Sequence, residues 1–169
     1  TYAEAHVNNL NGVIGLQGIS DVTVSADGKF VYTASYQSAA VSIFKRNIFN
    51  GTLTYRSTKT GVNTAFSIAT TNDNKSVYVA SPTGGVIIAF TRDELTGDIT
   101  EVSRHSGSPT GGFVSVSVSP DGKWVYGVGG SPSGLTVFKR DPETSSLTRV
   151  QDLVDNIDYV KFVSDSSKK

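Results

Sequence analysis

Short segments in which apolar and polar residues alternate follow one another along most of the chain, and clusters of Gly, Asn, Asp and Ser separate them. A period of two is the signature of a β-strand that buries one face. In the first such stretch, the alternation predicts strands over about residues 21–24, 30–34, 41–45 and 53–57. No window of ten or more residues shows the stripe of an amphipathic helix, so the predicted fold class is all-β.

This pattern of four strands is repeated. Residues 22–32 (V-T-V-S-A-D-G-K-F-V-Y) return as residues 68–78 and again as residues 116–126, and the closing tyrosines are 46 and 48 residues apart. Further along each copy, V-S-I-F-K-R returns as I-I-A-F-T-R and L-T-V-F-K-R. A unit of about 46 residues with four antiparallel strands has the size of a β-propeller blade. We therefore predict one propeller segment with complete blades over residues 20–64, 66–111 and 113–155.

Both ends are expected to belong to incomplete blades. Thr1 and Tyr2 align with Thr54 and Tyr55, so residues 1–19 are predicted to be the last strand and linker of a preceding blade. Residues 156–169 are predicted to begin a further blade. Closed propellers have about four to eight blades, and open blades expose sheet edges that favour association. We therefore expect a ring closed by a homo-oligomer, as a dimer or a multiple of dimers, or by further sequence.

Comparing the copies with one another separates scaffold from candidate site. A position kept in every copy is needed by every blade and so is expected to serve the fold. On this ground we predict packing between blades for Tyr32, Tyr78 and Tyr126, for Phe44, Phe90 and Phe138, and for Arg46, Arg92 and Arg140. Asp27, Asp73 and Asp121 are interpreted as turn residues that bond local backbone N–H groups. The lone Trp124 is expected to fill a groove between blades.

Composition narrows the range of partners. The chain has 15 basic and 15 acidic residues and a pI of about 6.6, which argues against nucleic acid as a partner. No apolar run approaches the roughly 20 residues that a membrane span requires. Cys is absent, which excludes disulfides and thiolate zinc sites, and the two His have no metal-ligand spacing. We therefore expect no cofactor and no metal site.

Function is expected in the loops that differ between copies. In a propeller, the loops that join second to third strands and those that join consecutive blades share one face. Here these loops are rich in amides and hydroxyls, which suit neutral sugars, although the same residue types are common in plain turns. The predicted ligand-binding residues are His6, Asn9, Asn11, Tyr36, Gln37, Asn63 and His105.

The repeated motifs V-x-V-S-x-D-G-K-x-V-Y, V-x-V-F-x-R and G-x-L-T resemble the lactonase-like, YVTN-type β-propeller repeat, and the resemblance covers nearly the whole chain. It implies a propeller fold. Proteins with this repeat include sugar-lactone hydrolases, metal-dependent lactonases, surface proteins and binding modules.

The chain carries no G-x-S-x-G or H-E-x-x-H motif, and neither His has a nearby Ser-and-acid arrangement. We therefore predict a secreted or extracellular lectin without enzymatic activity, whose repeated shallow pockets bind glycans, including N-acetylated hexosamines, with avidity. One alternative is part of a lactonase-like hydrolase, in which Asp21, Asp155 and Asp158 are the acids near the entrances of first strands. The other alternative is a protein-interaction scaffold.

Overall fold

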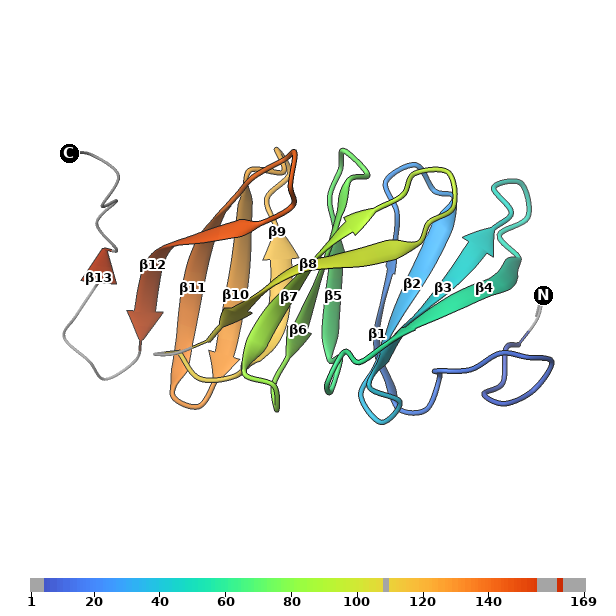
Figure 1. The fold of residues 1–169 in the computed structure, drawn as a ribbon, viewed down its shortest axis with the longest axis horizontal. Coiled ribbons are helices and arrows are strands. Elements are labelled where there is room, and N and C mark those ends of the chain that lie inside the picture. The colour runs from blue at the N-terminus through green and yellow to red at the C-terminus, as the bar shows by residue number, and fades with distance from the viewer. Residues whose placement is uncertain (1–4, 108–109, 155–160, 163–169) are drawn as a thin grey trace.

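The computed structural model describes residues 5–107, 110–154 and 161–162, and all regular structure in this part of the chain is β-strand (Figure 1). The first sheet consists of β1 (Ile19–Val24), β2 (Phe30–Ser35), β3 (Ala40–Arg46) and β4 (Leu53–Thr60), paired antiparallel in this order. The second consists of β5 (Ser67–Thr70), β6 (Ser76–Ser81), β7 (Val86–Arg92) and β8 (Ile99–Ser106). The third consists of β9 (Phe113–Val118), β10 (Trp124–Gly130), β11 (Ser133–Arg140), β12 (Leu147–Val154) and the short β13 (Lys161–Phe162).

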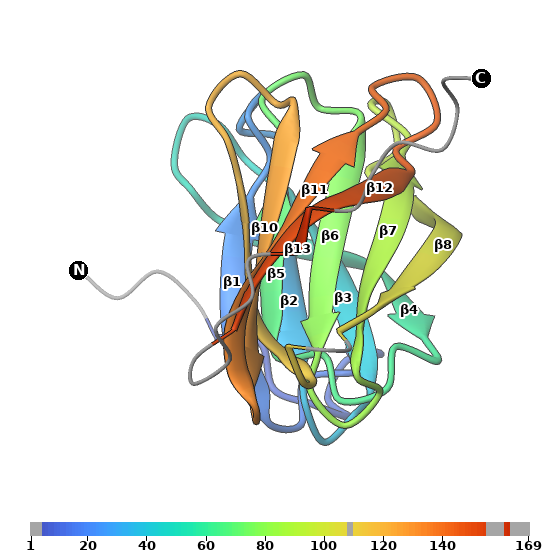
Figure 2. The same cartoon turned by 90° about the vertical axis from the view of Figure 1, so that its left-hand side faces the viewer.

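The three sheets are propeller blades, stacked face to face along the long axis of the molecule (Figure 1). The first strands β1, β5 and β9 contact one another from blade to blade. Figure 2 shows β1 and β5 at one side of the stack and β4 and β8 at the other. The predicted all-β propeller is therefore confirmed, and the described sheets do not close into a ring.

The hydrophobic core lies in the two seams between blades. The first seam buries a cluster that includes Phe30, Val77 and Phe90, and the second buries Phe113 and Phe138. Because a middle blade has neighbours on both faces, every residue of β6 is buried. The same repeat position in the last blade, β10, alternates between buried and partly exposed residues, because one of its faces has no neighbour among the described residues.

Where two described blades face each other, the repeat tyrosines form the cross-seam contacts that were predicted. Tyr32 and Tyr78 are fully buried, and their hydroxyls donate to the carbonyls of Gly97 and Ser145 in the following blade, at 2.8 and 2.9 Å. Burial raises the pKa of both phenols, although the nearby arginines act in the opposite direction. Both tyrosines therefore hold adjacent blades together as neutral hydrogen-bond donors.

The turn aspartates have a second role that the repeat pattern did not indicate. The Asp27 carboxylate accepts from the Lys29 N–H at 3.0 Å, as expected for a turn residue, but it also lies 3.0 Å from the Arg92 guanidinium of the next blade. Asp73 and Arg140 repeat this ion pair at 2.8 Å across the second seam. Each of these two carboxylates therefore stabilises both its own turn and the contact with the next blade.

The ends of the described chain differ from complete blades. Residues 5–18 form turns rather than a strand, and Val13 and Leu16 pack on Val31 and Phe44 of the first blade. The predicted strand at Thr1–Tyr2 lies outside the described residues. Of the further blade predicted from residue 156 onward, the structure describes only β13, which pairs antiparallel with β12 as a fifth strand. No described residue belongs to a helix long and apolar enough to cross a membrane.

Candidate functional site

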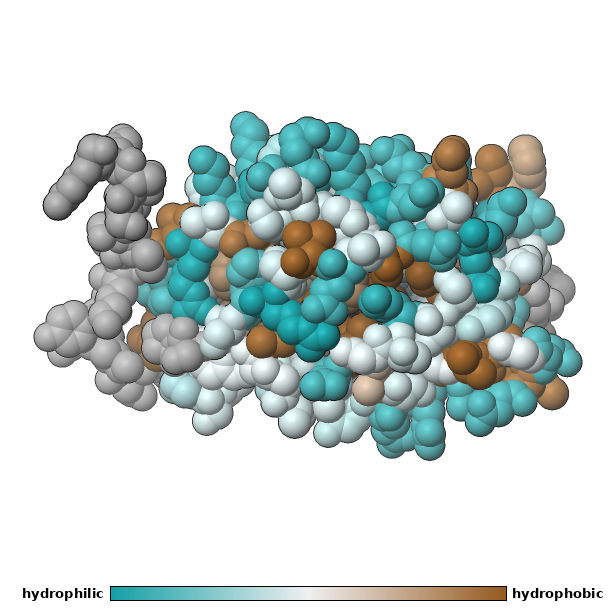
Figure 3. Space-filling model, viewed as in Figure 1, coloured by the Kyte–Doolittle hydropathy of each residue, from teal (hydrophilic) through white to brown (hydrophobic). Residues whose placement is uncertain are grey.

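The loops predicted to carry function lie together on the lower edge of the molecule in Figure 1. The β2–β3, β6–β7 and β10–β11 hairpins reach this edge, as do the β4–β5 and β8–β9 connections that lead into the inner strands. The opposite edge carries the remaining turns. In Figure 3 apolar side chains gather there at the upper right, over the β3–β4 and β7–β8 turns, where Phe49 and Leu95 are exposed.

Two exposed aromatic rings mark the lower edge at the seam between the first two blades. Tyr36, in the β2–β3 hairpin, and Phe66, just before β5, meet edge to face with ring centroids 6.4 Å apart. Their exposed fractions are 46% and 42%. The Tyr36 N–H donates to the Gly18 carbonyl at 2.8 Å, so the backbone that carries the Tyr36 ring is held in place.

Polar groups flank these rings. The Val62 N–H donates to the Ala39 carbonyl at 3.0 Å, which ties the β4–β5 connection to the first hairpin. The Thr64 Oγ1 accepts from the Thr83 N–H at 3.2 Å, and the Asn63 carbonyl accepts from the Ser81 hydroxyl. The entrance patch is the set formed by Tyr36, Gln37, Asn63, Thr64 and Phe66.

Asp21, one of the acids named for the lactonase-like alternative, has a structural role. One of its carboxylate oxygens accepts from the Val22 N–H at 2.8 Å, and the other accepts from the Ile68 N–H of the next blade at 2.9 Å. The carboxylate therefore joins β1 to β5. Asp155 and Asp158 lie outside the described residues.

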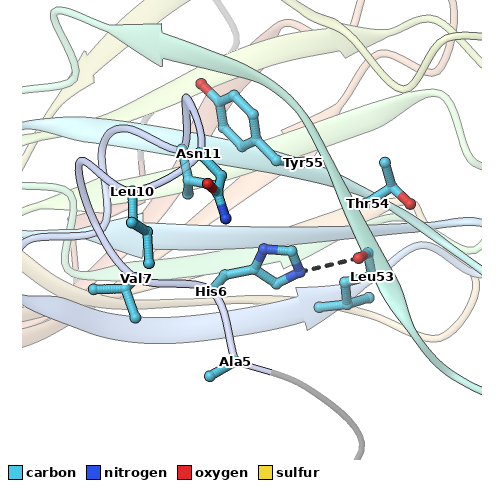
Figure 4. Close-up of a pocket in the computed structure, with 9 residues that line it drawn as sticks. Ala5, His6, Val7, Leu10, Asn11, Leu53, Thr54 and Tyr55 are labelled. Atoms are coloured by element: carbon cyan, nitrogen blue, oxygen red, sulfur yellow. Dashed lines mark hydrogen bonds between the residues drawn. The ribbon is translucent and has the colours of Figure 1, made fainter.

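His6 and Asn11 lie apart from the entrance patch, on the outward face of the first blade. They line a pocket of about 400 Å³ between the N-terminal segment and β4 (Figure 4). The His6 Nε2 is 2.9 Å from the Leu53 carbonyl oxygen, and its ring centroid is 5.1 Å from that of Phe44. Asn9 and Asn11 adopt left-handed backbone angles, with φ of 63° and 52°, so both serve turns in this segment.

His105 lies in a different seam, between the second and third blades. Its Nε2 is 2.8 Å from the Ser103 hydroxyl, and its ring packs on Phe138 with centroids 5.7 Å apart. Burial, assisted by the positive charge of Arg149, lowers the pKa of His105 below its ordinary value. The structure therefore brings together Tyr36, Gln37 and Asn63 among the predicted residues, and it separates both histidines from them.

A buried acid that pairs with Arg149, the cation acting on His105, was not found by sequence reasoning. Asp152 is 4% exposed, accepts from the Thr136 hydroxyl at 2.8 Å, and has each oxygen 3.1 Å from Arg149. Arg149 also donates to the Ser106 carbonyl, just as Arg104 donates to the Gly61 carbonyl one blade earlier.

These partners occupy equivalent positions of the repeat. Glu101 and Arg104 in the second blade correspond to Arg149 and Asp152 in the third, with the two charges exchanged. Because both pairs clamp the connection that precedes their own blade, we interpret the Arg149–Asp152 pair as scaffold. Among the described residues, no three His, Asp or Glu side chains come together in a way that could hold a metal ion.

Comparison with known families decides which kind of propeller this is. The family model described as "Lactonase, 7-bladed beta-propeller" matches residues 4–116 and, in a second register, residues 52–162. The chain belongs to this lactonase family. A sequence search of curated proteins found no match.

Three solved structures with the same fold as this lactonase-family chain share 23–24% sequence identity with it. A candidate 6-phosphogluconolactonase of Bacteroides uniformis has a TM-score of 0.77 at 24% identity, over 90% of this chain and 45% of that protein. A candidate 6-phosphogluconolactonase of Bacteroides fragilis has a TM-score of 0.72 at 23% identity, over 79% and 38%. The periplasmic gluconolactonase PpgL of Pseudomonas aeruginosa has a TM-score of 0.68 at 24% identity, over 85% and 42%. The chain thus spans less than half of each.

Membership in the lactonase family corrects the functional prediction. The expectation of a lectin that is not an enzyme is wrong, because the family and these structural neighbours point to a hydrolase. The alternative of a lactonase-like protein is the better supported one. The error arose because the missing catalytic motifs were sought in three blades, whereas the family builds rings of seven.

Proposed function

We propose that this chain contributes its blades to a propeller that hydrolyses a sugar lactone, and that the entrance patch binds the hydroxylated ring of the substrate. The observation that carries the proposal is the match to the lactonase family, whose two registers together reach from residue 4 to residue 162. The patch supports it, because it lies where inner strands begin and presents exposed aromatic and amide groups.

The chemistry of the patch suits one part of the reaction. Hydrolysis adds water to the lactone carbonyl, breaks the ring C–O bond and leaves a carboxylate and a free hydroxyl. Aromatic faces such as those of Tyr36 and Phe66 pack on the C–H side of a sugar ring, and the Gln37 and Asn63 amides can donate to and accept from its hydroxyls. The patch therefore orients the substrate.

The proton transfers are assigned to other residues of the ring. A general base must lie within hydrogen-bond reach of the attacking water, and both oxygens of Asp21 already accept backbone N–H groups. Substitutions in the patch should therefore raise KM and leave kcat nearly unchanged, because they remove binding that is common to ground state and transition state.

The test is a pH-stat assay of acid release by the native protein, with glucono-δ-lactone and 6-phosphogluconolactone assayed in parallel. The patch contains no Lys or Arg that could pair with a phosphate. We therefore expect the patch variants to raise KM for the neutral substrate, glucono-δ-lactone. Tyr36→Ala and Asn63→Ala should each raise KM about tenfold, which corresponds to about 1.4 kcal/mol.

Phe49→Ala is the control, because Phe49 is an aromatic residue on the opposite edge that is exposed even more fully, at 93% against 46% for Tyr36. It should leave KM unchanged. Lactone hydrolysis no faster than the spontaneous rate would exclude the proposed activity. Hydrolysis with an unchanged KM in both patch variants would place the substrate elsewhere on the ring.

A further inference from the structure

The two seams share one set of contacts, which we call the latch. In the first seam, Asp27 pairs with Arg92 at 3.0 Å and the Tyr32 hydroxyl donates to Gly97 at 2.8 Å. In the second seam, the corresponding distances are 2.8 Å for Asp73 with Arg140 and 2.9 Å for Tyr78 with Ser145. Each latch thus joins Asp and Tyr of one blade to Arg and a left-handed turn residue of the next.

The outward faces of the first and third blades carry the two halves of another latch. On the first blade, Arg46 donates to the Gly28 carbonyl at 3.1 Å, just as Arg92 and Arg140 donate to the equivalent carbonyls at 2.9 and 3.1 Å. Arg46 is therefore held in the same way, and among the described residues no carboxylate of a preceding blade pairs with it. On the third blade, Asp121 accepts from the Lys123 N–H at 3.1 Å in the same turn geometry.

The sizes of facing residues also match across these ends. In the first seam Phe30 packs so closely on Gly97 that a Cβ on this glycine would overlap its ring. In the second seam the same two positions are Ser76 and Ser145, whose hydroxyls are 2.7 Å apart. The outward faces carry the same combination of a large aromatic residue and a glycine as Phe30 and Gly97. The aromatic residue is Trp124 on the third blade, and the glycine is Gly51 on the first. A Cβ on Gly51 would meet no atom within 4 Å.

A pocket on the outward face of the first blade lies beside Gly51, where a large aromatic side chain that faces this glycine would enter. It has a volume of about 340 Å³ and is lined in part by Phe44, Gly51 and Leu53. Their counterparts in the second blade include Phe90 and Ile99, which form the first-seam cluster together with Phe30. Among the described residues, the place that Phe30 fills in the first seam is therefore open on the outward face.

We propose that a second copy of this chain docks head to tail, so that Trp124, Asp121 and Tyr126 of one copy meet Gly51 and Arg46 of the other. Charge and size complementarity between the two ends of the same chain favour a second copy as the occupant. Val128 and Leu153, which are 43% and 37% exposed on the third blade, add apolar surface to this contact. Because the contact joins two different surfaces, successive copies form a closed ring or an open chain.

The N-terminal segment covers part of the same face. Val13 and His6 lie on Phe44, and His6 approaches the Leu53 carbonyl (Figure 4). The incoming copy must therefore lift residues 5–13 from the first blade. Removing residues 1–13 should strengthen association, because it takes Val13 and His6 off the apolar face without touching Arg46 or Gly51.

The test measures the mass of the 169-residue chain by light scattering over a concentration series, with the emission of its single tryptophan recorded in parallel. We expect particles of at least twice the 17.9-kDa chain mass and a shift of the Trp124 emission to shorter wavelength as they form. Arg46→Asp and Asp121→Arg should each weaken association at least tenfold. An equimolar mixture of the two variants should restore it, because both junctions then join opposite charges.

Lys45→Asp is the matched control. It makes the same charge change one residue away, on an exposed side chain, and should leave association unchanged. Thermal unfolding of each variant confirms that the blades are folded. A chain that remains monomeric at every concentration overturns the proposal. The proposal is also overturned if either charge reversal leaves association unchanged, or if mixing the two variants fails to restore it. Neither result depends on lactone hydrolysis, so the proposed function stands or falls separately.

Discussion

The guanidinium of Arg92 lies 3.0 Å from the carboxylate of Asp27, on the far side of the seam between the first two blades, with its own side chain fully buried. It also donates to the Tyr32 hydroxyl at 2.7 Å and to the Asn74 carbonyl at 2.9 Å. A buried guanidinium is tolerated only when its N–H groups are paired. The latch is therefore a connected network, and loss of one member leaves the others unpaired.

Arg92→Met should destabilise the chain by roughly 3 kcal/mol, the range expected when one partner of a buried pair is removed. Arg46→Met is the control, because Arg46 occupies the same repeat position and donates to the Gly28 carbonyl. In the dilute chain its loss should cost about 1 kcal/mol or less. Urea unfolding followed by circular dichroism measures both values. Equal losses in the two variants would contradict a special role for the buried pair.

Much of the fold follows from local pattern. The predicted strands at 21–24, 30–34, 41–45 and 53–57 correspond to β1–β4 at 19–24, 30–35, 40–46 and 53–60, because alternation and turn residues act over a few positions. Comparison of the copies also identified Tyr32 and Tyr78 as cross-seam residues, since every blade needs them.

Contacts between different blades were harder to predict. Asp27 and Arg92 are 65 residues apart and each has a sufficient local explanation, so nothing in the sequence couples them. His6 and His105 align in the repeat, and their rings pack on the equivalent residues Phe44 and Phe138. The surroundings of His6 still differ, because residues 5–18 form turns over the first blade and not a strand. Asp152 was missed because its counterpart in the second blade is Arg104, and the pairing survives only as an exchange of charges.

The latch carboxylates should make stability depend on acid. Burial alone would raise the pKa of Asp27, but hydrogen bonds from Ser25 and Lys29 together with Arg92 lower it below its usual value. Thr71, Arg140 and Lys75 have the same net effect on the pKa of Asp73. A lowered folded-state pKa means that the unfolded chain takes up protons first, near pH 4. The stabilisation is therefore complete above that pH and is lost as the pH falls toward the lowered value.

Unfolding free energies between about pH 5 and pH 2.5 measure this loss. Asp27→Asn retains a turn acceptor but cannot titrate, so its stability should fall less steeply over this range. An equally steep fall in the variant would assign the acid dependence to other carboxylates.

His105 should add a dependence at higher pH. Burial and the charge of Arg149 lower its pKa, so the unfolded chain binds a proton near pH 6.5 while the folded chain does not. Stability should therefore decrease as the pH falls from about 7.5 to 5.5. His105→Gln removes this slope and keeps a group that can bond Ser103. Parallel pH profiles for the two proteins would show that His105 is as easily protonated in the fold as in the unfolded chain.

The third blade depends on a glycine for its close approach to the β8–β9 connection. A Cβ on Gly129 would overlap the backbone carbonyl of Thr110, and Gly129 lies where the pairing of β9 with β10 shifts register. Because backbone has to move, Gly129→Ala should destabilise by about 3 kcal/mol, at the upper end of overpacking effects.

Gly130→Ala is the control, since a Cβ there would meet only the Val114 Cγ1, at 3.1 Å, among nearby side chains. The Val114 methyl group belongs to a side chain and not to the backbone, and it has to yield by only a few tenths of an ångström, so we expect a loss below about 1 kcal/mol. Denaturant unfolding of both variants distinguishes the two sites. A smaller loss for Gly129→Ala than for Gly130→Ala would mean that the Thr110 carbonyl does not limit how closely the two blades pack.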